Sequence, residues 1–179
     1  MLWSVFRSLL QNIANWFDNM ASSSADQPQN KYDVFISFRG EDIRFNFTSH
    51  LYEALRRNHI DTFIDYRLEK GQEVWPSLVE AIEDSTLFLV IFSQNYASST
   101  WCLKELSKIL ECSKKQSHLM LPVFYRVDPS HVRKQSGSYQ TAFKTHENNK
   151  SINKQQLQKW RDDLTHSANL SGWHCRFDR

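Results

Sequence analysis

The sequence is short of the residues on which metal sites, disulfide scaffolds and phosphate-binding loops depend. Its 179 residues include four glycines and three cysteines. The cysteines, Cys102, Cys112 and Cys175, are odd in number and lack metal-ligand spacing, so a reduced, intracellular protein without a metal site is the simplest interpretation. The glycines never cluster. There is therefore no Gly-rich loop for dinucleotide phosphates, and a Rossmann-type dehydrogenase is unsupported.

Long apolar runs and a strong charge of one sign are also missing. No window reaches about eighteen consecutive apolar residues, so no segment is expected to span a membrane as a helix. The formal net charge of +2 is too small to indicate nucleic acid as the main partner. Apolar residues make up 40% of the chain, enough for the core of one domain with tails. We expect a cytoplasmic protein, with nuclear localisation or peripheral membrane association left open.

Residues 1–20 form a separate amphipathic unit. Apolar side chains share one helical face and polar side chains the other. The polar face carries one Arg and one Asp, whereas interfacial membrane helices usually carry several Lys or Arg. Weak membrane contact, docking on the domain and an incidental extension therefore all stay open. Residues 21–30, ASSSADQPQN, are expected to form a disordered linker. The apolar face consists of Leu2, Trp3, Phe6, Leu9, Leu10, Ile13, Trp16, Phe17 and Met20.

The chain is organised around the stretch from Ser85 to Ile109. The unbroken apolar run at 87–92 predicts a strand that is buried on both faces. After a polar loop, either Ser99 or Thr100 can cap the helix that follows. A buried parallel strand, a loop and a capped helix are half of a βαβ unit, and ligands of open α/β sheets bind at the carboxyl ends of such strands.

Glu105 lies one turn inside that helix. At 3.6 residues per turn it follows Trp101 by one turn, at the edge of the apolar stripe. One interpretation is a surface glutamate that pairs with Lys108 and adds a few tenths of a kcal/mol. The other is a carboxylate that faces the ligand crevice, and position alone leaves both open.

Strands and helices alternate along the rest of the chain. Pro122 should place its strand near an edge or make it locally irregular. The alternation predicts an α/β domain with a mostly parallel sheet, and the flavodoxin-like order 2-1-3-4-5 is among the few topologies allowed. In that order the loop after the first strand, at Arg39, and the loop at 99–105 face one crevice. Further strands are expected at 32–38, 59–65, 119–125 and 172–175, and helices around 47–55, 76–82, 128–146 and 157–168.

Five segments stand out in order along the chain. They are YDVFISFRGEDIR, the 65–71 loop, SQNYASSTWCLKEL, LPVFYRVDPSHVRKQSGSY and NLSGWHC. Together they resemble the motifs of a plant Toll/interleukin-1 receptor (TIR) domain. The resemblance covers residues 31–175 and leaves 176–179 as a tail. It implies the flavodoxin-like sheet reached above and one more helix after the GWHC strand, which we expect to be missing, as in a stand-alone member or a fragment. Residues 20–24 resemble the usual start of such proteins, so 1–19 would be an upstream extension.

The resemblance also implies an activity. Many plant members act in innate immunity and cleave NAD, as substrate rather than cofactor, at the nicotinamide–ribose bond. The catalytic glutamate of their WCxxEL motif falls on Glu105. The residues expected to contact NAD are Phe38, Arg39, Gly40, Arg44, Ser99 and Trp101. The family's mobile loop corresponds to 65–74, with Asp65 and Gly71. Self-association with other TIR domains is expected through Ser49 and His50 and near Gly137.

Two other functions fit the same sheet. A noncatalytic adaptor would act only through TIR–TIR contacts, and the disappearance of NAD would distinguish an enzyme from it. A phosphoacceptor receiver needs an aspartate at the end of the third strand, where this chain has Phe92-Ser93, so we set it aside. Fold alone would not separate these functions.

Overall fold

One parallel sheet of five strands forms the centre of the protein, in the order β2-β1-β3-β4-β5. The computed structural model describes the chain apart from residues 1, 22–29, 44–46, 65–73, 117 and 176–179. The order is the flavodoxin-like one expected from the sequence. The strands are β1 (Tyr32–Phe38), β2 (Thr62–Ile64), β3 (Ser85–Phe92), β4 (Leu119–Tyr125) and β5 (Trp173–Cys175), and every neighbouring pair is parallel.

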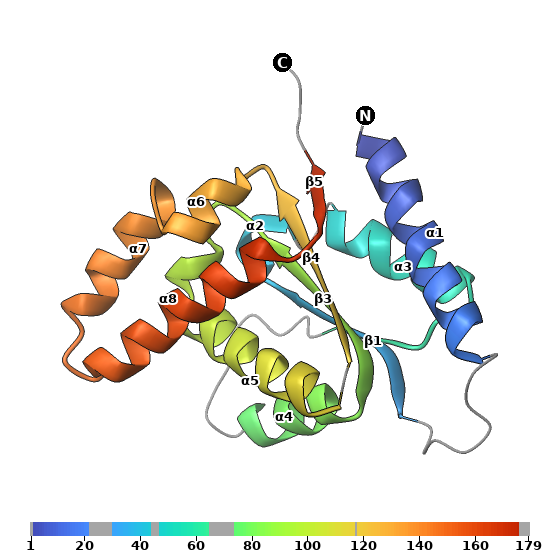
Figure 1. Ribbon diagram of the computed structural model, residues 1–179, viewed down its shortest axis with the longest axis horizontal. Coiled ribbons are helices and arrows are strands. Elements are labelled where there is room, and N and C mark those ends of the chain that lie inside the picture. Colours follow the sequence, from blue (N-terminus) through green and yellow to red (C-terminus); the bar gives the residue numbers. More distant parts are fainter. Residues whose placement is uncertain (1, 22–29, 44–46, 65–73, 117, 176–179) are drawn as a thin grey trace.

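Helices cover both faces of the sheet (Figure 1). One face carries α4 (Trp75–Glu83), α5 (Thr100–Gln116), α6 (Pro129–Lys134), α7 (Ser138–Glu147) and α8 (Lys154–Asn169). The other carries α1 (Leu2–Ala21) and α3 (Ser49–Arg57), and the single-turn helix α2 (Gly40–Ile43) follows β1. The core therefore has two layers, one on each side of the sheet.

Strand β3 joins the two layers, as its apolar run predicted. Phe88, Val90 and Phe92 belong to the core cluster under α5, and the alternate residues, such as Leu89 and Ile91, belong to the cluster under α3 and α1. All five are completely buried. A strand that feeds both cores needs apolar side chains at every position, which explains the unbroken run.

Three local predictions needed correction. Strand β2 begins at Thr62 rather than at the expected His59, because α3 ends at Arg57 and His59 takes a left-handed φ of 57°. The polar stretch after β1, expected to be a loop, forms the turn of helix α2. The linker expected at 21–30 does not include Ala21, since α1 continues to that residue, and positions 22–29 lie outside the described residues.

Pro122 is accommodated near the edge of the sheet, as expected. It pairs in register with Val90 of β3, but the pairing of β4 with the edge strand β5 begins only at Val123. Gly172, just before β5, lies so close that an added Cβ would approach the Pro122 carbonyl oxygen to 2.3 Å. The missing side chain at 172 is therefore what lets the last strand reach β4 beside a proline.

The N-terminal helix α1 is docked on the domain. Its Leu9 and Ile13 are completely buried against the sheet, and the ring of Phe6 packs edge-on against Phe47 at 5.9 Å. The polar face of the helix is exposed throughout. The sequence left open weak membrane contact, docking on the domain and an incidental extension, and the structure shows the helix docked on the domain. None of the helices in the described residues is long and apolar enough to cross a membrane.

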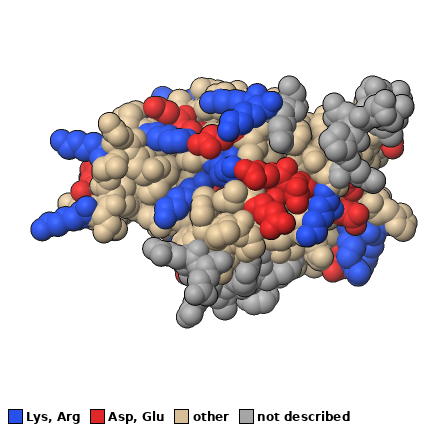
Figure 2. Space-filling model, turned by 90° about the horizontal axis from the view of Figure 1, so that it is seen from below, with Lys and Arg blue, Asp and Glu red and all other residues tan. Residues whose placement is uncertain are grey.

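Charge is interleaved on the face that Figure 2 shows. Lys and Arg side chains lie among Asp and Glu, and the acidic ones gather in a patch near the middle of this view. Among the described residues on this face, the basic side chains form no continuous surface of the kind that tracks a nucleic-acid backbone.

Candidate functional site

Glu105 is a buried carboxylate, which excludes one of its two interpretations. It is 2% exposed, and one of its oxygens accepts a hydrogen bond from Ser37 Oγ at 3.0 Å. Lys108, the partner expected for a surface glutamate, pairs instead with Glu83 of α4. The surface-pair interpretation was therefore wrong. An ionised group that is removed from water needs such partners, because uncompensated burial of charge is costly.

A tyrosine hydroxyl extends this buried polar cluster. Tyr96, in the 3₁₀ turn η3 (Tyr96–Ser98), lies 3.0 Å from Ser37 Oγ and donates to the carbonyl of Cys102 at 3.1 Å. Burial, with smaller contributions from Cys102 and Glu105, raises the pKa of Tyr96 well above its usual value. The phenol therefore stays protonated at neutral pH, and it lies beside the serine that donates to Glu105.

Arg39 lies at the carboxyl end of β1 beside the loop after β3. It donates to the carbonyl of Asn95 at 3.3 Å and to the hydroxyl of Ser98, and it forms ion pairs with Glu41 and Asp42. The two strand ends predicted to share a crevice are thus in direct contact. Glu41 is 72% exposed, so its carboxylate can leave Arg39 at little cost.

Asp42 fastens the two loops together. Its carboxylate accepts hydrogen bonds from the hydroxyl of Ser93 at 2.6 Å and from the backbone N–H of Asn95 at 3.2 Å. Both partners belong to the chain that leaves β3, while Asp42 belongs to α2. This contact sets the spacing between the segment that carries Arg39 and the start of α5.

Trp101 lies in the first turn of α5, as predicted, and it has an aromatic neighbour. Its ring centroid is 5.7 Å from that of Trp75, with an angle of 55° between the planes. The ammonium group of Lys104 lies 5.5 Å from the Trp101 ring. Both indoles are half-buried, so each keeps part of its surface in contact with solvent.

Three more residues predicted to contact NAD also have roles in the fold. Ser99, rather than Thr100, caps α5, since its Oγ accepts from the N–H of Cys102 at 3.3 Å. Gly40 is the first residue of α2. Phe38 is 5% exposed and packs in the cluster under α3 and α1, on the side of β1 opposite to Ser37. This placement favours a core role for the Phe38 ring over stacking on a base.

The predicted self-association residues lie on two separate surfaces. Ser49 and His50 begin α3, and His50 is exposed. Gly137 precedes α7 with a φ of 61°, and an added Cβ would meet the His131 ring at 3.3 Å. The backbone conformation is therefore sufficient to explain a glycine at this position. Three other predicted site residues lie outside the described residues: Arg44, Asp65 and Gly71.

Sequence reasoning missed Ser37, Tyr96, Asp42 and Trp75. For Ser37 a signal was available, since side chains alternate along a strand and the only polar residue in the VFISF run faces the same side as Phe35. The contacts of the others depend on the mutual placement of α2, α4 and η3. No local pattern predicts that placement.

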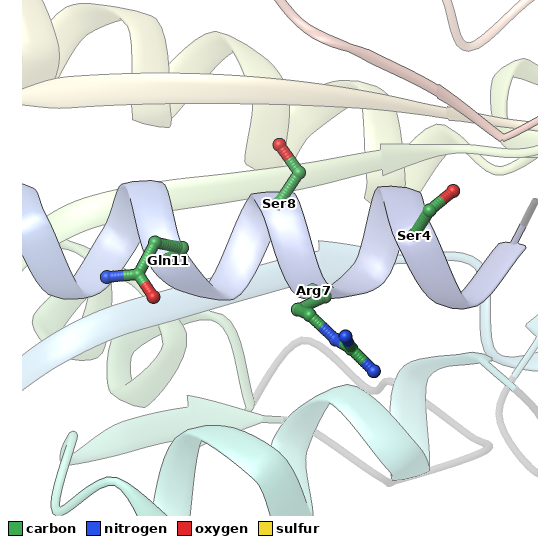
Figure 3. Close-up of a pocket in the computed structure, with 4 residues that line it drawn as sticks. All are labelled: Ser4, Arg7, Ser8 and Gln11. Carbon is green, nitrogen blue, oxygen red and sulfur yellow. The ribbon is translucent and has the colours of Figure 1, made fainter.

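A cavity beside α1 is unrelated to this cluster. It has a volume of about 480 Å³ and is lined by Ser4, Arg7, Ser8 and Gln11. Figure 3 shows that Ser4 and Ser8 point to one side of the helix and Arg7 to the other. None of these four residues belongs to the cluster around Glu105. In the part of the chain that the structure describes, no group of His, Cys, Asp and Glu is arranged to hold a metal ion.

Comparisons with known proteins agree with the fold. The family model described as TIR domain matches residues 31–177. Disease resistance protein RPV1 of Vitis rotundifolia is 53% identical over 163 residues, which cover 89% of this chain and 11% of the relative. TMV resistance protein N of Nicotiana glutinosa is 50% identical over 154 residues, covering 86% and 13%. The chain thus spans a small part of the length of these relatives.

A solved structure is similar as well. The TIR domains of the activated Roq1 resistosome superpose with a TM-score of 0.73 at 48% identity. The match covers 80% of this chain and 87% of that chain.

Proposed function

Because the chain belongs to the TIR-domain family, we propose that it is an NAD nucleosidase of plant innate immune signalling. The reaction cleaves the bond between nicotinamide and ribose and gives nicotinamide with ADP-ribose or a cyclic isomer. The observation that carries the proposal is the buried Glu105 carboxylate, which Ser37 holds behind the carboxyl ends of β1 and β3. The similarity to disease resistance proteins supports the setting in immunity.

The chemistry explains why one carboxylate suffices. The ring nitrogen of nicotinamide is cationic in NAD, so nicotinamide departs as a neutral molecule and needs no general acid. Most glycosidases, by contrast, must protonate a departing sugar oxygen. What remains is a ribose carbon with developing positive charge, which a desolvated carboxylate stabilises. In hydrolysis a water oxygen bonds to this carbon, and its proton is released to solvent.

The other groups of the crevice bind the rest of the substrate. Arg39 is a guanidinium at the crevice mouth and suits the pyrophosphate, for which it would exchange its exposed partner Glu41. Trp101 supplies an aromatic wall one turn before Glu105. Gly40, Ser99 and Arg44 complete the proposed contacts with NAD.

Self-association is the second part of the proposal. The similar TIR domains of Roq1 belong to an activated resistosome, which supports assembly as the active state here. His50 is exposed at the start of α3 and offers one contact surface. The noncatalytic adaptor remains the alternative, with the same contacts and no turnover.

The test is chromatography of NAD after incubation with purified protein at high concentration. The wild type should release nicotinamide, and Glu105→Gln, which keeps the size of the side chain and removes its charge, should not. Glu111→Gln is the matched control, because Glu111 is an exposed residue of the same helix. Equal turnover by wild type and Glu105→Gln would remove Glu105 from the mechanism. No turnover by a folded wild type would favour the adaptor.

A further inference from the structure

We propose that Trp75 is a second aromatic residue of the substrate site, which pairs with Trp101 to hold the nicotinamide ring of NAD. This inference rests on the proposed function and adds a binding residue to it. Its basis is the contact of the two indoles, with centroids 5.7 Å apart and planes at 55°.

The topology places both indoles at the carboxyl edge of the sheet, where the substrate is proposed to bind. Trp75 is the first residue of α4, the helix that follows β2, and Trp101 is the second residue of α5, which follows β3. In a parallel sheet the helix after each strand begins at the carboxyl edge. Arg39 and Ser98 meet at the same edge. The tryptophan pair is therefore on the substrate side of the sheet.

The exposure of the two rings distinguishes them from a core anchor. Trp160 is 1% exposed in the large core cluster, whereas Trp75 and Trp101 are both half-buried. Trp75 packs against the edge of that cluster, which fixes one side of its ring. Two adjacent half-buried indoles, one of them held against the core, present an apolar surface of the kind that planar rings bind.

Charge favours the nicotinamide end of the substrate. Nicotinamide in NAD is a cation, and cations are attracted to the faces of indole rings. The ammonium group of Lys104 lies 5.5 Å from the centre of the Trp101 ring, so a cation against this indole is compatible with the fold. Glu105, one turn from Trp101, needs the nicotinamide ribose beside it. This places the attached ring next to the pair.

The test is a binding titration in the full chain carrying Glu105→Gln, so that turnover does not consume the ligand. We expect Trp75→Ala to weaken the binding of NAD and of nicotinamide mononucleotide about tenfold, to leave AMP unaffected, and Trp75→Phe to restore most of the affinity. Phe63→Leu is the matched control, since Phe63 is another half-buried aromatic residue against the same core cluster. Unchanged NAD binding by Trp75→Ala, or an equal loss in Phe63→Leu, would overturn the proposal. A loss confined to NAD and AMP would overturn its assignment to nicotinamide.

A kinetic arm separates this inference from the proposed function. Kinetics are measured in the protein that keeps Glu105. If this protein turns NAD over and Trp75→Ala leaves its KM unchanged, the proposal for Trp75 is wrong and the proposed nucleosidase function is supported. If the same protein binds NAD more tightly than its Trp75→Ala variant does but shows no turnover, the proposed nucleosidase function is wrong and the binding role of Trp75 is supported. Absence of NAD binding overturns both.

Discussion

Ser37 Oγ and a carboxylate oxygen of Glu105 are 3.0 Å apart, although the two residues are separated by 68 positions in the chain. Ser37 is the penultimate residue of β1, and Glu105 projects from α5 onto the face of the sheet to which Ser37 points. The contact is completely removed from solvent on the serine side. The orientation of the proposed catalytic carboxylate is thus set by the packing of a helix on a strand.

We expect Ser37→Ala to lower kcat/KM for NAD about ten- to a hundredfold. A hydrogen bond to a charged group contributes about 1.5–3 kcal/mol, and each 1.4 kcal/mol changes a rate about tenfold. Ser85→Ala is the matched control. Ser85 is also completely buried, and its hydroxyl donates to the carbonyl of Ala81 at 2.6 Å rather than to Glu105. Both variants should lose similar stability in thermal unfolding. Equal losses of activity would show that the Ser37 effect is only structural.

Removing the charge of Glu41 should strengthen NAD binding. Glu41 pairs with Arg39 but is itself largely exposed, so the pair is a surface ion pair worth about 0.2–1 kcal/mol. Glu41→Gln would release the guanidinium for the pyrophosphate and lower KM by a factor of up to about five at low salt. The measurement is steady-state kinetics at two ionic strengths, with Glu53→Gln, from the exposed pair with Arg56, as control. A KM that rises in Glu41→Gln would mean that Glu41 orients Arg39 rather than competing for it.

The layout of the fold could be predicted from the sequence, and the interior of the site could not. The apolar run of β3 and the regular alternation of elements depend on periodicities that the chain carries locally. The burial of Glu105 depends on how closely α5 packs against β1. A charged residue at the edge of an apolar helical stripe is compatible with either burial or exposure, so the sequence could not predict this distance. Phe38 was assigned to the crevice, yet strand alternation with Ser37 turns its ring to the opposite core.

Specific activity should rise with protein concentration. If assembly completes the active site, turnover per chain depends on the fraction of assembled protein, as mass action requires. His50→Ala should lower activity at intermediate concentration and leave the unfolding temperature within experimental error, because His50 is exposed. Activity assays over a dilution series, with light scattering of the same samples, provide the check. Specific activity that stays flat from dilute to concentrated solution contradicts assembly-dependent turnover.

Cys175 should make the protein less stable at alkaline pH. Burial raises the pKa of this thiol to about 11, from an ordinary value of 9.0. Below the ordinary pKa both the folded and the unfolded chain hold the proton, so the free energy of unfolding is unaffected. Between about pH 9 and 11 the unfolded thiol ionises first, and the free energy of unfolding falls by up to about 1.4 kcal/mol per pH unit.

Urea unfolding of wild type and Cys175→Ala under reducing conditions measures this effect. The cavity left by alanine gives a constant offset, and the advantage of the wild type should shrink as the pH rises through this window. Tyr96 and Tyr139, whose pKa values burial also raises, contribute equally to both proteins and cancel. An advantage that stays constant from pH 8 to 10.5 contradicts the assignment.

Helix α1 should stabilise the domain by covering the part of the sheet beside α3. Leu9 and Ile13 are completely buried there, and replacement of either by alanine costs about 2–5 kcal/mol in a well-packed core. The loss is limited here, because the rest of the domain can persist once α1 detaches. The variant that carries both Leu9→Ala and Ile13→Ala should therefore have a free energy of unfolding no lower than that of a chain that starts at Met20. Gln11→Ala, on the exposed face, is the control.

The same proteins test whether α1 contacts membranes. A detached helix of twenty residues is marginal in water, so it must cover its apolar face with the sheet or with lipid. Since the sheet already covers that face, the full chain and the chain starting at Met20 should sediment equally with vesicles. Leu9→Ala and Ile13→Ala remove apolar side chains that either the sheet or a lipid surface could cover. Neither variant should therefore bind vesicles more than the wild type does. Stronger sedimentation of the full chain that varies little with salt would instead support membrane contact through apolar burial.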